Sequence, residues 1–550
     1  MRGLMQQRAL TVHALWERVE QNFGHKRVVT ATRSGETTAT WREVGERARR
    51  LTGVLDQLGA AADARIGTLA WNTQRHVELY LAVPTSGRVL HTLNHRLYLD
   101  DLRYIIEDAA DEVLFIDRSL VPKLAPLLAE LRAVRHLVIM DDGGDEPVPD
   151  DPRVADYEQL LTAAQPVTPR DDLDEDDAAN LCYTSGTTGP PKGVLYSHRS
   201  IALHALMLLG ADGFAISERD VVMPIVPMFH VNAWGLPYAA MLAGSDLVLP
   251  GPAMQPEALL DQLERHRVTF SAGVPTIWRS IQPLLGGADL SSLRMVVSGG
   301  GALPDSLSRA WEEAIGIPLT SSWGMTETSP VVACSRVGTA HDGLPADERR
   351  RLLGVPGPNL PFTRLRILDD DGQPVEHDGS TPGELQVSGP TVAGGYFGDD
   401  SGSAFTDDGW LRTGDVATID RFGYLRIVDR TKDLVKSGGE WISSVALENE
   451  IMAHPSVREA AVIAVADERW GERPLACVVP AEGCAVEPGE LRDFLAGRVS
   501  SWWIPEQIWV LGEIPKTSTG KFSKLALRQL RAELDAVGQA TGGSAAEPSR

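Results

Sequence analysis

Cysteine and positive charge are both scarce in this chain. Its 550 residues include only 4 cysteines, and they show neither zinc-ligand spacing nor a nearby His-rich segment. A disulfide framework is not expected at this length, so a reducing cytoplasm is the predicted compartment. Lys and Arg number 52 against 75 Asp and Glu, which gives a formal net charge of −23. This balance argues against a general nucleic-acid binder or a protein of anionic membranes, because both need a basic face.

Long apolar runs are absent as well. No uncharged run approaches the ~20 residues of a membrane-spanning helix, so no integral membrane segment is predicted. The N-terminal segment MRGLMQQRALTVHALWERVE meets charge too soon to resemble a signal peptide. Hydrophobic residues make up 43% and charged residues 23%, which is typical of a globular protein with a sizeable core.

Short β-rich runs alternate with helical patterns along much of the chain. Strands are expected at residues 65–71, 112–116, 136–140, 179–183, 221–227, 246–249 and 294–297, and helices at 40–58 and 256–266. This alternation favours an α/β fold with buried sheets. From about residue 363 to 427, Gly, Pro and Asp turns separate shorter strands. A β-rich subdomain is therefore predicted within a large N-terminal domain.

The most informative segment is Tyr183-Thr-Ser-Gly-Thr-Thr-Gly-Pro-Pro-Lys192-Gly193. It follows a short apolar strand and precedes residues 200–209, which have a helical pattern. Glycine lets backbone amides approach a phosphate closely, hydroxyl groups donate to its oxygens, and Lys192 adds positive charge. The segment is not a Walker A loop, because Lys192 follows two prolines and precedes Gly193 rather than Ser or Thr.

At these residues the chain resembles the adenylate-forming superfamily of acyl-CoA synthetases, nonribosomal peptide adenylation domains and luciferases. The resemblance covers most of the chain, and it is strongest to bacterial medium- and long-chain fatty-acyl-CoA synthetases. The strings that carry it are YTSGTTGPPKG, PMFHVNAW, SWGMTETSP, KSGGEWISS and PKTSTGKFSK.

The resemblance implies a two-step reaction. A fatty acid or related carboxylic acid attacks the α-phosphate of ATP to give acyl-AMP and pyrophosphate, and the thiol of CoA then displaces AMP. Both first-step reactants are anionic, so a protein of net charge −23 must concentrate cations, oriented amides and a metal in one cleft. The resemblance implies Mg²⁺ held by Thr184 and Glu327, since a hard cation favours oxygen ligands. It also implies that the protein can form a homodimer.

The nucleotide site follows from the same motifs. Trp323 would stack on adenine, where many relatives carry Tyr, Thr326 would contact the α-phosphate, and Asp415 and Arg430 would reach the ribose. The implied nucleotide-binding residues of the large domain are Thr184, Ser185, Gly186, Thr187, Thr188, Gly189, Lys192, Gly300, Gly301, Ala302, Ser321, Ser322, Trp323, Gly324, Thr326, Asp415 and Arg430.

The C-terminal part is expected to be a small, mobile α+β lid. Predicted boundaries are 1–430 for the large domain, 431–535 for the lid and 536–550 for a disordered tail. The resemblance places Lys432 at the hinge and implies that the lid rotates between the two half-reactions. One orientation would present Lys521 for adenylation. The other would present the pantetheine passage, formed by Lys436, Gly438, Gly439 and Trp441.

The carboxylic-acid site is assigned to the almost uncharged segment 223–237. The resemblance places His230 beside the reacting carboxylate, so the implied catalytic residues are Lys521, His230, Lys192, Glu327 and Thr184. Val231 and Trp234 would line a substrate tunnel. If a helix begins at His230, Trp234 shares its face. Trp234 is either a movable door on the tunnel or an ordinary core residue.

Other functions remain open at this point. An acyl-AMP ligase that loads a carrier protein, or a CoA ligase for aryl or other acids, shares these motifs. A non-catalytic nucleotide-binding regulator is a remote alternative, because the implied catalytic residues are all present.

Overall fold

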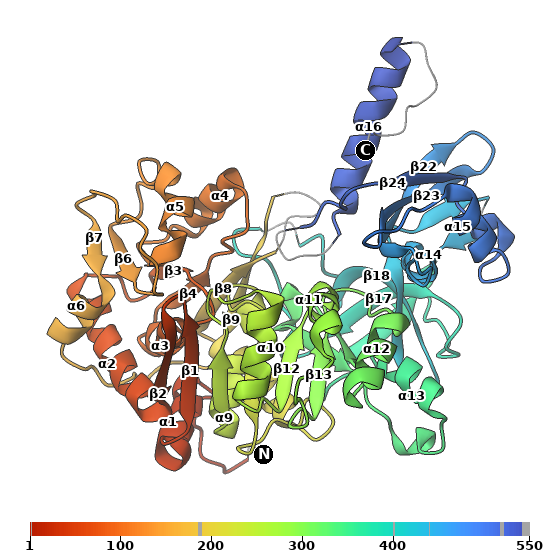
Figure 1. The fold of residues 1–550 in the computed structure, drawn as a ribbon. Helices are drawn as coiled ribbons and strands as arrows, with labels where there is room; N and C mark the ends of the chain where they lie inside the picture. The colour runs from red at the N-terminus through yellow and green to blue at the C-terminus, as the bar shows by residue number, and fades with distance from the viewer. Residues whose placement is uncertain (2, 185–189, 400–401, 439, 518–521, 542–550) are drawn as a thin grey trace.

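The computed structural model describes residues 1, 3–184, 190–399, 402–438, 440–517 and 522–541. It has the predicted α/β architecture, with mixed sheets and a separate C-terminal domain (Figure 1). None of the helices in the described ranges is long and apolar enough to cross a membrane.

The first sheet has the order β7-β6-β5-β3-β4-β8-β9, and its strands are parallel except for the β8–β9 pair. Six of the seven strands predicted from the sequence match strands of this sheet or the next one within two residues at each end, and the strand predicted at 221–227 ends three residues earlier, at Pro224. The strands are β3 (Arg65–Leu69), β4 (Val89–Thr92), β5 (Val113–Asp117), β6 (His136–Met140), β7 (Val154–Asp156), β8 (Ala178–Tyr183) and β9 (Gly193–Ser197).

The second sheet has the order β15-β14-β13-β12-β10-β11-β1-β2, with antiparallel pairs only at its two edges. Its strands are β1 (Arg27–Thr32), β2 (Gly35–Thr40), β10 (Val221–Pro224), β11 (Asp246–Leu249), β12 (Phe270–Gly273), β13 (Met295–Ser298), β14 (Thr320–Gly324) and β15 (Val331–Cys334).

Helices pack against these sheets around one large hydrophobic cluster and two smaller ones. The expected helix at 40–58 is α2, which the Thr40–Glu43 capping box starts, because each side chain bonds the other residue's backbone N–H. The helices of this part are α1 (Val12–Phe23), α2 (Trp41–Gln57), α3 (Gln74–Thr85), α4 (Leu99–Ala109), α5 (Val121–Leu124), α6 (Tyr157–Ala163), α7 (His198–Leu209), α8 (Val231–Trp234), α9 (Leu236–Ala243), α10 (Pro256–Arg265), α11 (Pro275–Ile281), α12 (Asp305–Ile315) and α13 (Ala346–Leu353).

The predicted β-rich subdomain is a four-stranded antiparallel sheet. It comprises β16 (Arg364–Leu368), β17 (Gly383–Ser388), β18 (Leu411–Ile419) and β19 (Leu425–Arg430). Asp415 on β18 pairs in register with Arg430 on β19, so the two residues assigned to the ribose are neighbours across one strand pair.

The C-terminal domain carries a five-stranded sheet and lies to one side of the large domain, in blue in Figure 1. Its elements are β20 (Val435–Ser437), β21 (Glu440–Ile442), α14 (Ser444–Met452), β22 (Val457–Asp467), β23 (Gly471–Pro480), α15 (Pro488–Leu495), β24 (Gln507–Val510) and α16 (Lys524–Thr541). Helix α16 extends to Thr541, into the segment for which the sequence predicts a disordered tail. Residues 542–550 lie outside the described part.

Candidate active site

A cavity of about 570 Å³ opens at the carboxyl ends of β8, β10, β13 and β14. Ligand sites in open α/β sheets form at this edge, where loops from neighbouring strands converge. The cavity brings together 13 of the 20 predicted site residues that the structure describes. Those that line it are Thr184, Lys192, His230, Val231, Trp234, Gly300, Ser322, Trp323, Gly324, Thr326, Glu327, Arg430 and Lys432.

The segment 183–193, which the sequence predicts to bind phosphate and which we call the phosphate loop, is closed at its base by hydrogen bonds where β8 ends and β9 begins. The Thr184 N–H donates to the Lys192 carbonyl at 2.9 Å, and the Lys192 N–H donates to Thr184 Oγ1 at 3.0 Å. Strand β9 lies between this loop and α7. The sequence predicts the helix at 200–209 but no strand before it. Ser185, Gly186, Thr187, Thr188 and Gly189 lie outside the described residues.

Lys192 carries the positive charge of this loop into the cavity. Its Nζ lies 2.9 Å from Asp399 Oδ2 and 4.7 Å from the centre of the Tyr396 ring. The Lys192 side chain is half-exposed, and its ammonium group pairs with the Asp399 carboxylate. It can therefore move to phosphate oxygens without breaking a buried hydrogen-bond network.

Glu327 is a buried carboxylate at the same end of the cavity. Its side chain accepts a hydrogen bond from the Tyr396 hydroxyl at 2.7 Å, and burial together with this carboxylate raises the pKa of Tyr396. The Glu327 turn is fixed by Tyr196, whose hydroxyl donates to the Thr326 carbonyl at 2.6 Å. One carboxylate and the Thr184 hydroxyl, with phosphate oxygens to complete the shell, fit the oxygen ligands that Mg²⁺ prefers.

The nucleoside end is built around Asp415. This carboxylate is only 2% exposed, it receives the Trp323 indole N–H at 2.9 Å, and it pairs with Arg430 Nε at 2.6 Å. The indole is therefore fixed by a hydrogen bond, which orients its face toward one side of the cavity. An anchored Trp323 can stack on a base. Asp415 itself is buried and does not line the cavity, so its contact with a ribose stays a prediction.

The glycine-rich loop after β13 contributes less than the sequence predicts. Gly300, whose φ is 76°, lines the cavity, whereas Gly301 and Ala302 are exposed and do not line it. A Cβ atom on Gly299 would lie 2.7 Å from Ser322 Oγ and 2.8 Å from the Trp234 indole. The requirement for glycine at 299 therefore comes from close packing. Ser321 is buried behind the wall.

The segment after His230 differs from its prediction. Residues Val231, Asn232, Ala233 and Trp234 have φ angles of 48°, 54°, 49° and 57°, so α8 is a left-handed turn. The shared right-handed face proposed for His230 and Trp234 does not exist, although both line the cavity. A left-handed conformation costs roughly 1–2 kcal/mol for each L-residue, and of the four residues in VNAW only Asn232 has a propensity for it.

The site residues predicted for the hinge and the C-terminal lid that the structure describes lie in two different places. Lys432 lines the cavity, next to Arg430. Lys436 and Trp441 face each other across the β20–β21 hairpin, with the Lys436 ammonium 4.4 Å from the indole ring. Gly438 turns this hairpin at φ 62°, against Trp470. None of these three hairpin residues is among the residues that line the cavity. Gly439 and Lys521 lie outside the described residues.

Sequence reasoning missed two residues of the phosphate end. Tyr396 and Asp399 lie in a turn-rich segment, GGYFGDD, whose composition indicates only a loop. The structure shows that they contact Glu327 and Lys192. An aromatic pair, Tyr396 and Phe397, between glycines is the one sequence signal that could have pointed to Tyr396.

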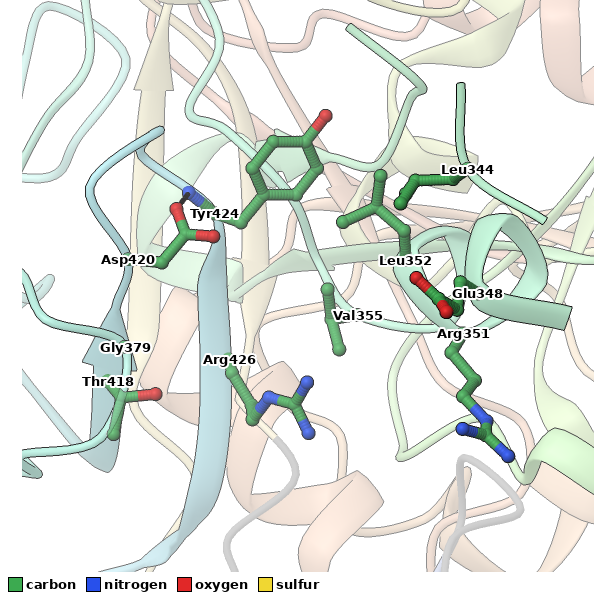
Figure 2. A pocket seen from close by; sticks show the side chains of 10 residues that line it. All are labelled: Leu344, Glu348, Arg351, Leu352, Val355, Gly379, Thr418, Asp420, Tyr424 and Arg426. Carbon is green, nitrogen blue, oxygen red and sulfur yellow. Dashed lines mark hydrogen bonds between the residues drawn. The ribbon is translucent and has the colours of Figure 1, made fainter. Parts of the chain in front are cut away.

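A second, smaller hollow of about 270 Å³ lies between α13 and the strands β18 and β19. Figure 2 shows Arg351 and Arg426 at its edge and an apolar wall formed by Leu352 and Val355. It contains none of the predicted site residues.

A cleft at the carboxyl edges of two α/β sheets, with a separate C-terminal domain, agrees with the fold expected for an adenylate-forming enzyme. The model of the AMP-binding enzyme family matches residues 15–397, and that of the AMP-binding enzyme C-terminal domain matches residues 446–521. The chain belongs to the AMP-binding enzyme family.

Known proteins similar to this chain support that assignment. A long-chain-fatty-acid–CoA ligase of Thermus thermophilus is 46% identical, with 94% of this chain and 95% of the relative covered. A 3-methylmercaptopropionyl-CoA ligase of Ruegeria lacuscaerulensis is 42% identical, with 96% and 98% covered. The crystal structure of the anthranilate CoA ligase AuaEII with anthranoyl-AMP has a TM-score of 0.85 at 25% identity, with 98% and 100% covered.

Proposed function

We propose that this protein is an ATP-dependent fatty-acid–CoA ligase that forms acyl-AMP and then acyl-CoA. The observation that carries the proposal is the single cavity in which the phosphate, nucleoside and acid ends meet. Lys192 and Glu327 lie at the phosphate end, Trp323 lies at the nucleoside end, and Trp234 and Val231 form the apolar acid end. The fatty-acid–CoA ligase at 46% identity supports the choice of acid and of thiol.

In the first step a carboxylate oxygen bonds to the α-phosphorus of ATP, and the bond from that phosphorus to pyrophosphate breaks. Lys192 and Thr326 would offset charge on the phosphates, while Asp415 and Trp323 hold the nucleoside so that attack is in line. Thr184 and Glu327 would hold Mg²⁺, which would neutralise phosphate charge when bound. Lys521 would supply a further cation to the carboxylate and the α-phosphate.

In the second step the CoA sulfur bonds to the acyl carbon, and AMP leaves with the acid's former oxygen. The thiol proton must be lost, and the anionic AMP is the leaving group. In the proposed domain rotation about Lys432, the β20–β21 hairpin would replace the Lys521 loop at the cavity. Gly438 and Gly439 would then line the pantetheine passage, because a β-carbon would narrow it.

One observation favours a shorter acid as a second candidate. Trp234 is 5% exposed and lines the cavity, while Tyr238 and Met241, which belong to the same core cluster as Trp234, are buried and do not line it. In this arrangement the cavity accommodates a short tail, as a 3-methylmercaptopropionyl-CoA ligase relative would require. A long tail requires Trp234 to move.

A panel of acids tests the proposal. Straight-chain acids from C2 to C18, 3-(methylthio)propionate and benzoates are assayed for AMP release with and without CoA. CoA-dependent turnover that peaks on medium or long chains is the expected result. A peak on 3-(methylthio)propionate would replace fatty acids with the second candidate. Pyrophosphate release without CoA-dependent turnover would indicate a carrier-protein ligase. If no acid is turned over but ATP still binds, the protein would be a non-catalytic regulator.

Trp234→Ala tests the door separately. Removing the indole opens the inner wall, so kcat/KM for C14–C18 acids is expected to rise relative to C4–C6 acids by about tenfold, close to the effect of one or two methylene contacts. The measurement is the chain-length profile of the variant. An unchanged profile and an unchanged acid KM would make Trp234 a core residue.

A further inference from the structure

The left-handed turn that carries Val231 and Trp234 is held from behind by a buried hydrogen-bond network. Asn180 on β8 is completely buried, and its Nδ2 donates to Asn232 Oδ1 at 3.1 Å. Asn232 is 6% exposed and is the residue of this turn whose side chain tolerates positive φ best. The bond therefore joins the strand that leads into the phosphate loop to the middle of the turn.

Further contacts fix Asn180 itself. Its Nδ2 also donates to the Tyr238 hydroxyl at 2.9 Å, and that hydroxyl lies 3.3 Å from the Tyr80 carbonyl. The Cys182 thiol, two residues along β8, donates to Asn232 Oδ1 at 3.6 Å. Each of these groups is buried, so loss of one partner leaves a polar atom without water to replace it.

The turn itself has little else to keep it left-handed. Its internal bonds run from the Ala233 N–H to the His230 carbonyl at 3.1 Å and from the Gly235 N–H to the Asn232 carbonyl at 2.9 Å. Successive positive φ angles in non-glycine residues persist only where the surroundings fix them, and such positions are typical of functional sites. Asn232 carries the only side-chain amide of the 231–234 turn, and its Oδ1 accepts hydrogen bonds from Asn180 Nδ2 and from the Cys182 thiol.

We propose that Asn180 and Asn232 are positioning residues for the acid site, because their hydrogen bond holds the left-handed turn that sets His230 and Trp234 in the cavity. This proposal rests on the proposed function for its effect on acids, although its structural part does not. Neither asparagine lines the cavity, so both act through the turn and not by touching the acid.

The test uses Asn180→Leu, which keeps the branched shape of the side chain and removes the donor, and Asn232→Gly, which suits positive φ but lacks the acceptor. Each variant is expected to lower kcat/KM for acids by about 10- to 100-fold, the effect of leaving a buried polar group unpaired. Short acids, which rest against Trp234, are expected to lose more than long ones. The KM for ATP is expected to stay within about twofold of the wild-type value. Because both changes break the same hydrogen bond, the kcat/KM of the double variant is expected to be no lower than that of the less active single variant.

Ser308→Ala is the matched control. Ser308 is 1% exposed on α12, far along the chain from the turn, and its hydroxyl accepts the Leu319 N–H at 3.1 Å. This variant also loses a buried bond and some stability, yet its ratio of short- to long-acid kcat/KM is expected to equal that of the wild type. An equal, proportional loss for all acids in Asn180→Leu and Asn232→Gly would reduce the two asparagines to a structural role and overturn the proposal.

Hydrogen exchange gives a readout that needs no substrate. Peptides that span residues 228–238 are expected to exchange about tenfold faster in Asn180→Leu than in the wild type and unchanged in Ser308→Ala, because the amides of Ala233 and Gly235 depend on the turn. Unchanged exchange in this segment overturns the inference even if the wild type is active. Faster exchange in a protein that turns over no acid would instead defeat the proposed function and leave the turn's attachment confirmed.

Discussion

Lys521→Ala is expected to slow acyl-AMP formation by about 100- to 1,000-fold, the usual effect of removing one preorganised electrostatic contact to a reacting centre. In the proposed mechanism this lysine meets the carboxylate and the α-phosphate only in the first step. Attack of CoA on supplied acyl-AMP is therefore expected to stay within about threefold of the wild type. The two half-reactions are measured separately, by pyrophosphate release without CoA and by AMP release from synthetic acyl-AMP.

The same segment offers a control. Lys516 has the same charge, but its Nζ is bound to Glu459 at 2.8 Å, so Lys516→Ala is expected to change neither half-reaction by more than about twofold. Equal losses in both half-reactions for Lys521→Ala would contradict the exchange of lids about the hinge.

Asp415→Ala is expected to raise the KM for ATP by about 100-fold. The carboxylate would bind two ribose hydroxyls, which at about 1.5 kcal/mol for each charge-assisted bond amounts to about 3 kcal/mol. Its removal also frees Trp323 and Arg430, which it orients at 2.9 Å and 2.6 Å. The measurement is initial rate against ATP concentration at saturating acid and CoA, with ATP binding by calorimetry as a second readout.

Asp378→Ala is the matched control for that variant. Asp378 belongs to the same subdomain, and its carboxylate accepts the N–H groups of Ser380 and Thr381 in an exposed turn. This variant is expected to retain the wild-type KM for ATP. If Asp415→Ala also retained it, the nucleoside would not bind at the Trp323–Asp415 end of the cavity.

Much of the fold could be predicted because strand periodicity is a local property. The strands at 136–140 and 246–249 have the predicted bounds. The helix predicted at 40–58 differs from α2 by only one residue at each end, and its capping box is visible in the sequence as a start signal. Strand β9 was not predicted, because its five residues give too short a pattern to indicate a strand. The order of strands in the sheets depends on contacts between distant segments, which no single window contains.

The motifs predicted many of the residues that line the cavity, but they did not predict the contacts and the backbone conformation there. Motif resemblance found Lys192 and Glu327, whereas their partners Asp399 and Tyr396 come from a loop with no distinctive pattern. The left-handed turn after His230 was predicted as a right-handed helix, because its conformation is imposed by tertiary hydrogen bonds and not by the residues VNAW.

The most direct test of the account uses an acid whose carboxylate carries ¹⁸O, chosen as the best substrate of the panel. If the acid attacks the α-phosphate and CoA then displaces AMP, one labelled oxygen must stay on phosphorus. Mass spectrometry of the released AMP is expected to show one ¹⁸O per molecule at full CoA-dependent turnover. Unlabelled AMP, or ADP with label in inorganic phosphate, would contradict the acyl-adenylate mechanism.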